Sequence, residues 1–508
     1  MPKVLFITAD QWRGDCLGVS GHPCVKTPAL DELAKTGTRF SRHFAQAAPC
    51  GPSRASLHTG MYMMNHRSVG NGTPLDPRFT NIALEVRKQG FEPALIGYTD
   101  TSPDPRGRPS LDPALNTYCG VLPGFKQLVP ESEGPIAWMR HLQSLGYDYE
   151  NVSHPEDDPS VWDPAFSEPA ATARGGTYGA APYRSEHSDT AFSTDHAIRY
   201  IREKAGKDWF LHLSLLRPHP PFIVPAPYHD LYSPGDGPDF VRHADATKEA
   251  SVHPYAALRC AQTDKWTAAH GLDLSQEVSR RQLRATYWGM MTEVDAHLGR
   301  LLEVLRQTGD DEDTLVVFTS DHGEQLLDHW HIGKLSYNDQ SFHIPLIVRQ
   351  PGAAGGRVVD SFTENVDIMP TILDWLGADV PLQCDGQSLV PWIEGATPRS
   401  WRENVFYEVD FRDVRAGSTE LRFSIDMDAC NFSVLRGDEY KYIHFADLAP
   451  LLFNIEKDAG ELQNLAGKPD MSVVELEQAQ RLLSHRMRYS ERTWTHTLVT
   501  RNGLVDRV

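Results

Sequence analysis

The sequence lacks the features that mark membrane, secreted and nucleic-acid-binding proteins. No apolar run reaches the roughly 18 residues that a bilayer-spanning helix needs. The N-terminus has no basic segment, long apolar stretch and cleavage site like those of a signal peptide, so we expect the mature protein to begin at residue 1. Basic residues are fewer than acidic ones. The 49 Lys and Arg and the 68 Asp and Glu give a net charge of -19. This charge opposes binding to nucleic acid or to an anionic membrane, and an anionic substrate therefore needs a local cationic site.

Cysteine is also scarce. The seven cysteines in 508 residues are odd in number and widely scattered. Such a set favours a reducing cytoplasm over a disulfide framework, and we expect a cytoplasmic protein in which six of the cysteines are small core residues. Cys50 is the exception, because its neighbours indicate a chemical role.

The hydrophobic pattern predicts an α/β protein. A chain of 508 residues exceeds the usual size of one hydrophobic core, so we expect a large domain and a smaller one. Short β-branched runs alternate with helical stretches, which predicts a mostly parallel sheet covered by helices on both faces. The expected strands are residues 4–8, 94–97, 209–216, 314–319 and 346–349, and the expected helices are residues 28–38, 81–89, 194–204, 278–306 and 366–376.

The pattern changes beyond about residue 400. Strand-like runs at residues 404–409, 421–425, 433–435 and 440–444 predict a smaller antiparallel sheet. We expect a catalytic domain over residues 1–400, a C-terminal sheet domain over 401–470, and a helix and polar tail over 471–508 that is a candidate oligomer arm. Two loop-rich segments, residues 104–188 and 218–273, are expected to build the rim of the site.

Two pairs of polar residues follow predicted strands directly. Asp10 and Gln11 come after the first strand, and Asp321 and His322 come after the strand at 314–319. Ligands of open α/β sheets bind beyond the carboxyl ends of the strands, so these pairs are expected to converge on one cation. Carboxylate, amide and imidazole ligands suit Ca²⁺, Mg²⁺ or Mn²⁺, with Mn²⁺ or Ca²⁺ preferred. The alternative is that each Asp only caps the turn that follows it.

A third group of residues surrounds Cys50. Pro52 suits the first turn of a helix, whose backbone N–H groups favour an anion at Cys50. Arg54, one turn further, is placed to neutralise or clamp negative charge on the same side. A thiol at such a helix start is expected to be acidified and reactive, whereas the alternative is a buried structural cysteine.

The segment Cys50-Gly51-Pro52-Ser53-Arg54-Ala55-Ser56-Leu57-His58-Thr59-Gly60 resembles the signature of sulfatases, which belong to the alkaline phosphatase superfamily. Similarity extends to residues 26–31, 319–324, 367–373, 452–456 and 464–466. The resemblance implies an alkaline-phosphatase-like, mostly parallel sheet flanked by helices, with a smaller C-terminal antiparallel-sheet α+β domain. It also implies that a formylglycine-generating enzyme reads Pro52 and Arg54 and oxidises Cys50 to formylglycine. One hydroxyl of the hydrated aldehyde is then the nucleophile, and the other expels the product.

One departure from the family pattern indicates a subgroup. Ordinary sulfatases carry Gly-Lys-x-His on the strand after the nucleophile, but this chain has Gly97-Tyr98-Thr99-Asp100. Fewer cations at the anion site suit a singly charged diester or phosphonate monoester. Residues 103–106, 217–222 and 338–342 also resemble the bacterial phosphonate monoester hydrolases, which are phosphodiesterases with side activity on aryl sulfates.

The same resemblance implies further roles and a homo-oligomer, commonly a tetramer. His219 corresponds to the residue that protonates the leaving group, and Lys334 to the lysine that contacts the transferred group and its leaving oxygen. Asn71 and Tyr98 correspond to residues that line the substrate oxygens, and we group Thr99 and Asp100 with them. Whether Asp100 orients the formylglycine hydrate or repels the substrate stays open.

The sequence therefore predicts a metal-dependent hydrolase of phosphonate monoesters and phosphodiesters, promiscuous toward aryl sulfates, that uses a formylglycine made from Cys50. Its partners would be small anionic esters and the maturation enzyme. Three alternatives stay open: an arylsulfatase, a metal-binding pseudoenzyme whose Cys50 stays a thiol, and a phosphomutase or phosphatase of the superfamily with an unmodified nucleophile.

Overall fold

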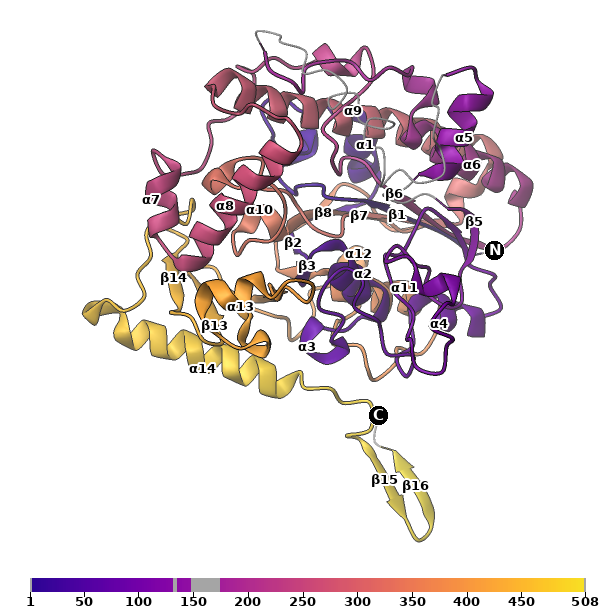
Figure 1. Cartoon of the computed structure of the whole chain (residues 1–508). Coiled ribbons are helices and arrows are strands. Elements are labelled where there is room, and N and C mark those ends of the chain that lie inside the picture. The colour runs from indigo at the N-terminus through magenta and orange to yellow at the C-terminus, as the bar shows by residue number, and fades with distance from the viewer. Residues whose placement is uncertain (1, 131–134, 148–173, 507–508) are drawn as a thin grey trace.

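A computed structural model describes residues 2–130, 135–147 and 174–506. The predicted rim segment 104–188 lies in part outside the described residues, as do the last two residues of the predicted tail. Helices on both sides of a central sheet form the body of the molecule (Figure 1). Among the described residues, no helix combines the length and apolar character needed to cross a membrane.

The central sheet has nine strands in the order β10-β2-β8-β7-β1-β6-β4-β5, with β9 also paired to β2. The strands are β1 (Lys3–Ala9), β2 (Thr38–Phe44), β4 (Ala94–Ile96), β5 (Lys126–Val129), β6 (Trp209–Leu215), β7 (Thr314–Thr319), β8 (His343–Arg349), β9 (Arg357–Val359) and β10 (Thr363–Glu364). Every pair is parallel except those that β8 makes with β2 and β7. The predicted mostly parallel sheet is confirmed.

The helices of the described chain fall on either side of this sheet or along the smaller one (Figure 1). They are α1 (Pro28–Thr36), α2 (Cys50–Thr59), α3 (Met63–His66), α4 (Ile82–Lys88), α5 (Ile136–Ser144), α6 (Asp189–Lys204), α7 (Ala246–Ser251), α8 (Pro254–Ala269), α9 (Glu277–Thr308), α10 (Asp339–Phe342), α11 (Ile368–Trp375), α12 (Val390–Glu394), α13 (Ser418–Phe423) and α14 (Ser472–Arg488). The segment 218–273 was expected to be loop-rich, but it contains α7 and α8. Pro254 starts α8, and the His253 side chain accepts a hydrogen bond from the Tyr255 N–H there.

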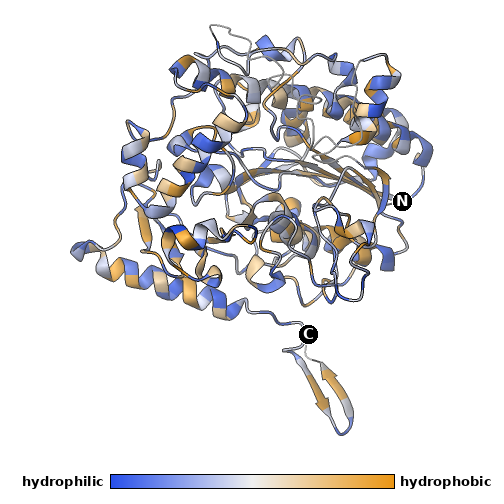
Figure 2. Cartoon of the chain, in the orientation of Figure 1, coloured by the Kyte–Doolittle hydropathy of each residue, from blue (hydrophilic) through white to orange (hydrophobic). Residues whose placement is uncertain are grey.

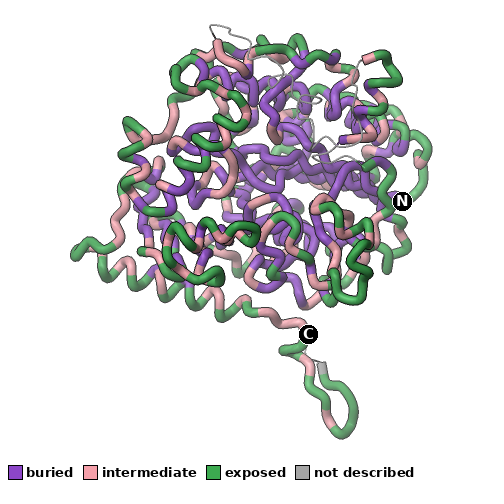
Figure 3. Tube along the Cα trace, in the orientation of Figure 1, coloured by how far each residue is buried: buried purple, intermediate pink, exposed green. Residues whose placement is uncertain are grey.

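Successive apolar side chains of β1 point to opposite faces of the sheet, which explains why helices cover both faces. Leu5 and Ile7 belong to the core that includes α1, α6 and α9, whereas Val4 and Phe6 belong to the core that includes α2, α4 and α11. A strand that is apolar on both faces is typical of a parallel sheet between two helical layers. The central strands of the sheet carry many hydrophobic residues in Figure 2, and they are buried in Figure 3.

The smaller sheet has the order β14-β13-β12-β11-β3. Its strands are β3 (Ala47–Ala48), β11 (Val405–Asp410), β12 (Asn431–Arg436), β13 (Tyr440–Phe445) and β14 (Leu451–Asn454). β3 pairs in parallel with β11 and the other pairs are antiparallel, which confirms the smaller antiparallel sheet. Because β3 ends just before Cys50, the C-terminal sheet supports the chain where it enters helix α2.

The strand predicted at 421–425 is wrong. This segment begins as helix α13, and the Asp413 carboxylate accepts hydrogen bonds from Ser418 at the start of that helix. Leu421 is 80% exposed, so the run has no sheet face to bury. Residues 421–423 therefore end a short helix, and Phe423 and Ile425 pack against the core of the smaller sheet from outside it.

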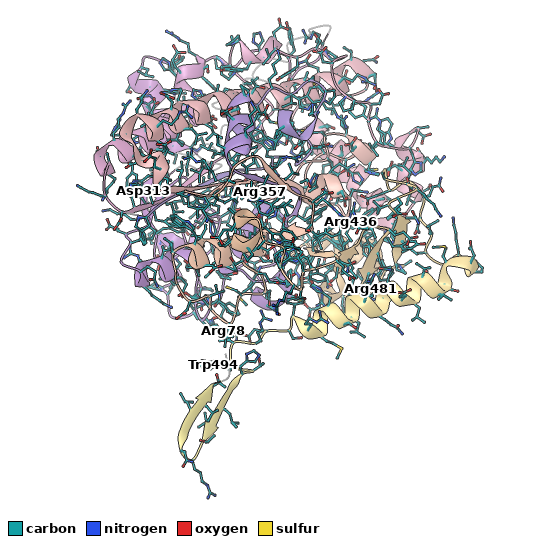
Figure 4. The ribbon with its side chains drawn as sticks, turned by 180° about the vertical axis from the view of Figure 1, so that it is seen from behind. Arg78, Asp313, Arg357, Arg436, Arg481 and Trp494 are labelled. Atoms are coloured by element: carbon teal, nitrogen blue, oxygen red, sulfur yellow. The ribbon has the colours of Figure 1, made fainter. Side chains whose placement is uncertain are left out.

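The chain ends beyond α14 in a separate hairpin of β15 (Thr497–Thr500) and β16 (Gly503–Asp506). The hairpin stands away from the body and is exposed, and Trp494, 74% exposed, lies where it begins (Figures 3 and 4). Val499 and Leu504 are also exposed there. The expected role as an oligomer arm stays a prediction.

Candidate active site

The carboxyl ends of three adjacent strands place the polar pairs of the sequence side by side. Thr8 of β1 is in register with Thr319 of β7, and Ala9 is in register with Leu215 of β6. The residues that follow these strands therefore leave the sheet at the same edge. The N-terminus of α2 meets this edge, because the Ser53 hydroxyl donates to the Asp321 carbonyl oxygen at 2.5 Å.

Asp10, Cys50, Asp321 and His322 form one buried cluster. Their ligand atoms all lie within 4.8 Å of one another. His322 Nε2 is 3.8 Å from Oδ1 of Asp10 and 3.8 Å from Oδ1 of Asp321. His322 Nδ1 is 3.1 Å from the Gly323 carbonyl oxygen, which only accepts, so Nδ1 carries the proton and Nε2 points its lone pair into the cluster. Two carboxylate oxygens and an imidazole nitrogen are a suitable donor set for a divalent cation.

Gln11 adds an amide oxygen beside this cluster. Its φ of 69° turns the chain sharply after β1, and its N–H donates to Asp321 Oδ1 at 3.1 Å. Its Oε1 accepts a hydrogen bond from Lys334 Nζ at 3.0 Å, and its Nε2 donates to Glu324. The structure thus brings together all four residues that were predicted as metal ligands.

Arg54 holds the two carboxylates in place. Its Nε donates to Asp321 Oδ2 at 2.8 Å, and its Nη2 donates to Asp10 Oδ2 at 3.0 Å. Nη1 donates to the Tyr98 carbonyl oxygen and the Ser214 hydroxyl, and Nη2 also reaches the Tyr98 hydroxyl. All five N–H groups of the guanidinium are therefore used within the protein. Arg54 is a positioning residue that leaves Oδ1 of each carboxylate facing His322, rather than a direct clamp on the substrate.

Cys50 lies at the first position of α2 and is 1% exposed. Its Sγ is 2.9 Å from Lys334 Nζ, 3.2 Å from His322 Nε2 and 3.9 Å from Asp10 Oδ1. Burial and the Asp10 carboxylate raise the pKa of the Cys50 thiol well above its ordinary value, against the lowering effect of Lys334. The expectation of an acidified thiol is therefore wrong, because burial outweighs the helix start and the lysine. The raised pKa favours the neutral thiol over the thiolate at this position.

The pKa of Asp10 is lowered, whereas that of Cys50 is raised. Burial acts to raise its pKa, but His219, Lys334, Arg54 and His322 together lower the pKa of the Asp10 carboxyl well below its ordinary value. This carboxyl is therefore ionised at neutral pH and available to a cation.

Lys334 and His219 line a pocket of about 390 Å³ that also includes Gln11 and Pro49. His219 Nδ1 is 2.7 Å from the Pro220 carbonyl oxygen, so Nδ1 carries a proton and Nε2 is the nitrogen that exchanges one. Lys334 Nζ contacts both Cys50 and Gln11. The two residues predicted to serve the leaving group thus line one pocket, and Lys334 contacts Cys50 there.

The predicted substrate-binding residues separate into two groups. Tyr98 is buried, and its hydroxyl donates to Asp10 Oδ2 at 2.6 Å; Asn71 Oδ1 accepts from the Gly51 N–H at 2.9 Å, next to Cys50. Asp100 is buried with a φ of 53°, and its charge contributes to the raised pKa of Cys50. Thr99 turns away, because its hydroxyl donates to the Gly120 carbonyl oxygen at 3.0 Å.

Sequence reasoning missed Glu324. This carboxylate is fully buried and accepts hydrogen bonds from the Leu326 and Gly333 N–H groups at 3.0 and 2.6 Å, and from Gln11 Nε2. It therefore fixes the amide of Gln11 and the loop that carries Lys334. Its position two residues after His322, in a segment that resembles the family, was the available signal.

Comparisons with known proteins agree with this geometry. The Sulfatase family profile matches residues 2–378, and the profile of the N-sulphoglucosamine sulphohydrolase C-terminal region matches residues 328–488. The chain is 40% identical to the multifunctional alkaline phosphatase superfamily protein PehA of Trinickia caryophylli, over 99% of each chain. 

Two solved structures are also similar over nearly their whole length. The phosphonate monoester hydrolase of Agrobacterium radiobacter has a TM-score of 0.92 and 42% identity, with 100% of both chains covered. The phosphonate monoester hydrolase SpPMH of Silicibacter pomeroyi has a TM-score of 0.92 and 38% identity, with 100% of this chain and 99% of that chain covered. The chain therefore belongs to the sulfatase family of the alkaline phosphatase superfamily.

Proposed function

We propose that this hydrolase cleaves phosphonate monoesters and phosphodiesters, and aryl sulfates more slowly, through a formylglycine made from Cys50. The observation that carries the proposal is Tyr98, which stands where ordinary sulfatases have a lysine. Its buried hydroxyl bonds to Asp10 and Arg54 and brings no positive charge to the site. The two similar structures described as phosphonate monoester hydrolases support the same assignment.

The charges of the site explain this preference. The carboxylates of Asp10 and Asp321 are balanced by Arg54 and Lys334, and the buried carboxylate of Asp100 adds a negative charge nearby. The net positive charge offered to a substrate then comes mainly from the bound cation. A singly charged ester is easier to accommodate there than a phosphate monoester with two charges, because the second charge finds no matching cation.

Asp10, Gln11, Asp321 and His322 are the residues that would hold the cation, with Mn²⁺ or Ca²⁺ as our preferred identity. When bound, such an ion supplies Lewis acidity toward an ester oxygen and toward the nucleophilic hydroxyl. Burial lowers the pKa of His322, which favours the neutral imidazole that binds metals.

Lys334 and His219 serve the leaving group. Lys334 Nζ lies 2.9 Å from the atom that the nucleophile replaces, so its charge is placed to stabilise the group under attack. His219, protonated at Nε2, would deliver a proton to the departing oxygen from the pocket side.

Maturation of Cys50 has to precede complete folding. Cys50, Pro52 and Arg54, the residues that a formylglycine-generating enzyme is expected to read, are all buried in α2. An enzyme that binds this segment therefore meets it before the helix packs against the sheet.

A comparison of rates on four substrates tests the proposed function. We expect kcat/KM for a phosphonate monoester and a phosphodiester to exceed the values for a phosphate monoester and an aryl sulfate by about tenfold or more. Each substrate would carry the same 4-nitrophenyl leaving group. A highest rate on the sulfate would identify an arylsulfatase instead, and no turnover of any ester would favour a pseudoenzyme.

Replacement of His219 by Ala is expected to affect esters according to their leaving group. Alkyl esters should lose about 10²- to 10³-fold in kcat/KM, because an alkoxide needs a proton as it leaves, whereas 4-nitrophenyl esters should lose less than about tenfold. Replacement of His444 by Ala, an exposed histidine of β13, is the matched control. An equal loss on both ester classes would rule out proton donation by His219.

A further inference from the structure

The pocket that Lys334 and His219 line also has aromatic and apolar lining residues. They are Phe222, Trp266, His270 and Leu272. Trp266 stacks on His270 at a centroid distance of 4.2 Å and makes an edge contact with Phe222 at 6.2 Å. A pocket of about 390 Å³ with an aromatic wall suits a ring-sized group. The shared wall with His219 and Lys334 makes this the side on which the leaving group lies.

Arg259, on α8, also lines this pocket. It is 8% exposed, and its Nη1 donates to the Gln262 side chain. Nε has no hydrogen-bond partner within the part of the chain that the structure describes. A Cβ built on Gly333 would lie 4.0 Å from Arg259 Nη2, so the guanidinium sits next to the residue that precedes Lys334. Its charge is thus close to the reaction but is not part of the cluster around Cys50.

Within the described part of the chain, Arg259 differs from the other buried arginines in its lack of a carboxylate partner. The described chain buries five arginines: Arg13, Arg54, Arg217, Arg259 and Arg284. Each of the other four has a carboxylate oxygen within 3.0 Å. Arg13 pairs with Asp15 and Asp328, Arg54 with Asp10 and Asp321, Arg217 with Asp189, and Arg284 with Asp328. Among the described residues, Arg259 alone of these five has no carboxylate within 4.0 Å, the distance that defines an ion pair.

The carboxylate that acts on Arg259, that of Glu324, already has hydrogen-bond partners of its own. Glu324 acts on Arg259 electrostatically, but its oxygens accept hydrogen bonds from Leu326, Gly333 and Gln11. A buried cation without a paired anion is costly, and proteins seldom keep one unless a ligand completes it. The missing anion is therefore expected to arrive with the substrate.

We propose that Arg259 binds an anionic group, a carboxylate or a phosphate, carried on a ring-sized leaving group of the substrate. The inference rests on the proposed function, because it assumes that the ester bond is cleaved at Cys50. The aromatic wall would pack against the body of the leaving group while the guanidinium pairs with its charge. Arg259 would then select among leaving groups, whereas the cluster around Cys50 selects the group that is transferred.

Matched esters of phenylphosphonic acid test this proposal. The leaving groups would be 4-carboxyphenyl and its neutral near-isostere 4-carbamoylphenyl, measured with the wild-type chain and with Arg259→Met. We expect the ratio of kcat/KM for the carboxylate over the carboxamide to fall by about tenfold or more in the variant, because a charge-assisted bond is lost. A role in folding alone would lower both esters together and leave the ratio unchanged, which would overturn the proposal.

Two further variants control the test. Lys265→Met removes an exposed charge from the same helix and should leave the ratio unaltered. Arg259→Lys keeps the charge and should retain part of the preference. A loss of preference with Lys265→Met equal to that with Arg259→Met would show a long-range charge effect and contradict a binding site at Arg259. Thermal melting shows whether each variant is folded.

A third ester and a binding measurement identify the anion and test Arg259 independently of ester cleavage. A 4-phosphonophenyl ester, compared with the 4-carboxyphenyl ester, shows which anion loses more on Arg259→Met; no loss for either overturns the proposal. If no ester is turned over, the proposed function fails, and calorimetric binding of 4-hydroxybenzoate against 4-hydroxybenzamide still tests Arg259. Tighter binding of the benzoate by the wild-type chain only would support the site, and equal binding would reject it.

Discussion

Replacement of Cys50 by Ala should lower kcat/KM on every ester by about four orders of magnitude or more, because it removes the nucleophile. The side chain lies at the centre of the site, within 3.2 Å of both Lys334 and His322. Metal content should stay largely intact, because Asp10, Gln11, Asp321 and His322 remain. Steady-state rates and elemental analysis of the purified chain measure the two effects separately.

Cys430 provides a matched control for this prediction. It is fully buried, like Cys50, but lies before β12 in the smaller sheet. Its replacement by Ala should reduce stability modestly and leave kcat/KM close to the wild-type value. Retention of most activity by Cys50→Ala would show that the nucleophile is another group.

The mass of the peptide that contains Cys50 is the second measurement. Conversion of the thiol to an aldehyde removes one sulfur and two hydrogens and adds one oxygen. We expect activity to follow the fraction of chains with the aldehyde mass, because the raised pKa of the buried Cys50 thiol disfavours the thiolate. Activity in chains that carry only the thiol would favour the superfamily enzymes with an unmodified nucleophile.

The sequence predicted the site well where a residue follows a strand. Asp10 and Asp321 come directly after β1 and just after β7, and parallel strands deliver such residues to one edge whatever the loops do. The C-terminal sheet was predicted in part: residues 421–423 belong to helix α13 instead, and strands β3 and β14 were not predicted. A short apolar run does not show which of its side chains will be buried, and that decides between strand and helix.

The sequence could not show which charges are already paired. Arg54 was expected to neutralise or clamp negative charge beside Cys50, and the charges that its guanidinium pairs with are the carboxylates of Asp10 and Asp321. Its other N–H groups bond to Tyr98 and Ser214. Arg259 attracted no attention in the sequence, because one arginine in a predicted loop resembles any other. Its lack of a carboxylate partner among the described residues becomes visible only after α8 is placed beside the Lys334 loop.

Loss of the bound cation should have the second-largest effect. Replacement of Asp321 by Asn is expected to lower kcat/KM by roughly 10³-fold or more, since a cation in such a site contributes several kcal/mol of charge stabilisation. It should also reduce stability, because Asp321 Oδ2 accepts from Arg54 Nε at 2.8 Å and the pair is fully buried. Removal of one partner of a buried ion pair costs about 3–5 kcal/mol.

Replacement of His322 by Ala separates metal binding from stability. Arg54 donates its hydrogen bonds to Asp10, Asp321, Tyr98 and Ser214 and none to His322, so its ion pairs stay in place and the melting temperature should fall less than in Asp321→Asn. Metal affinity should still fall by about 100-fold or more, and excess Mn²⁺ or Ca²⁺ should restore part of the activity. Chelation and readdition of metal to the wild-type chain provide the reference. Full activity of His322→Ala without added metal would show that His322 is not a metal ligand. Its contact with Cys50 would then have no role in metal binding.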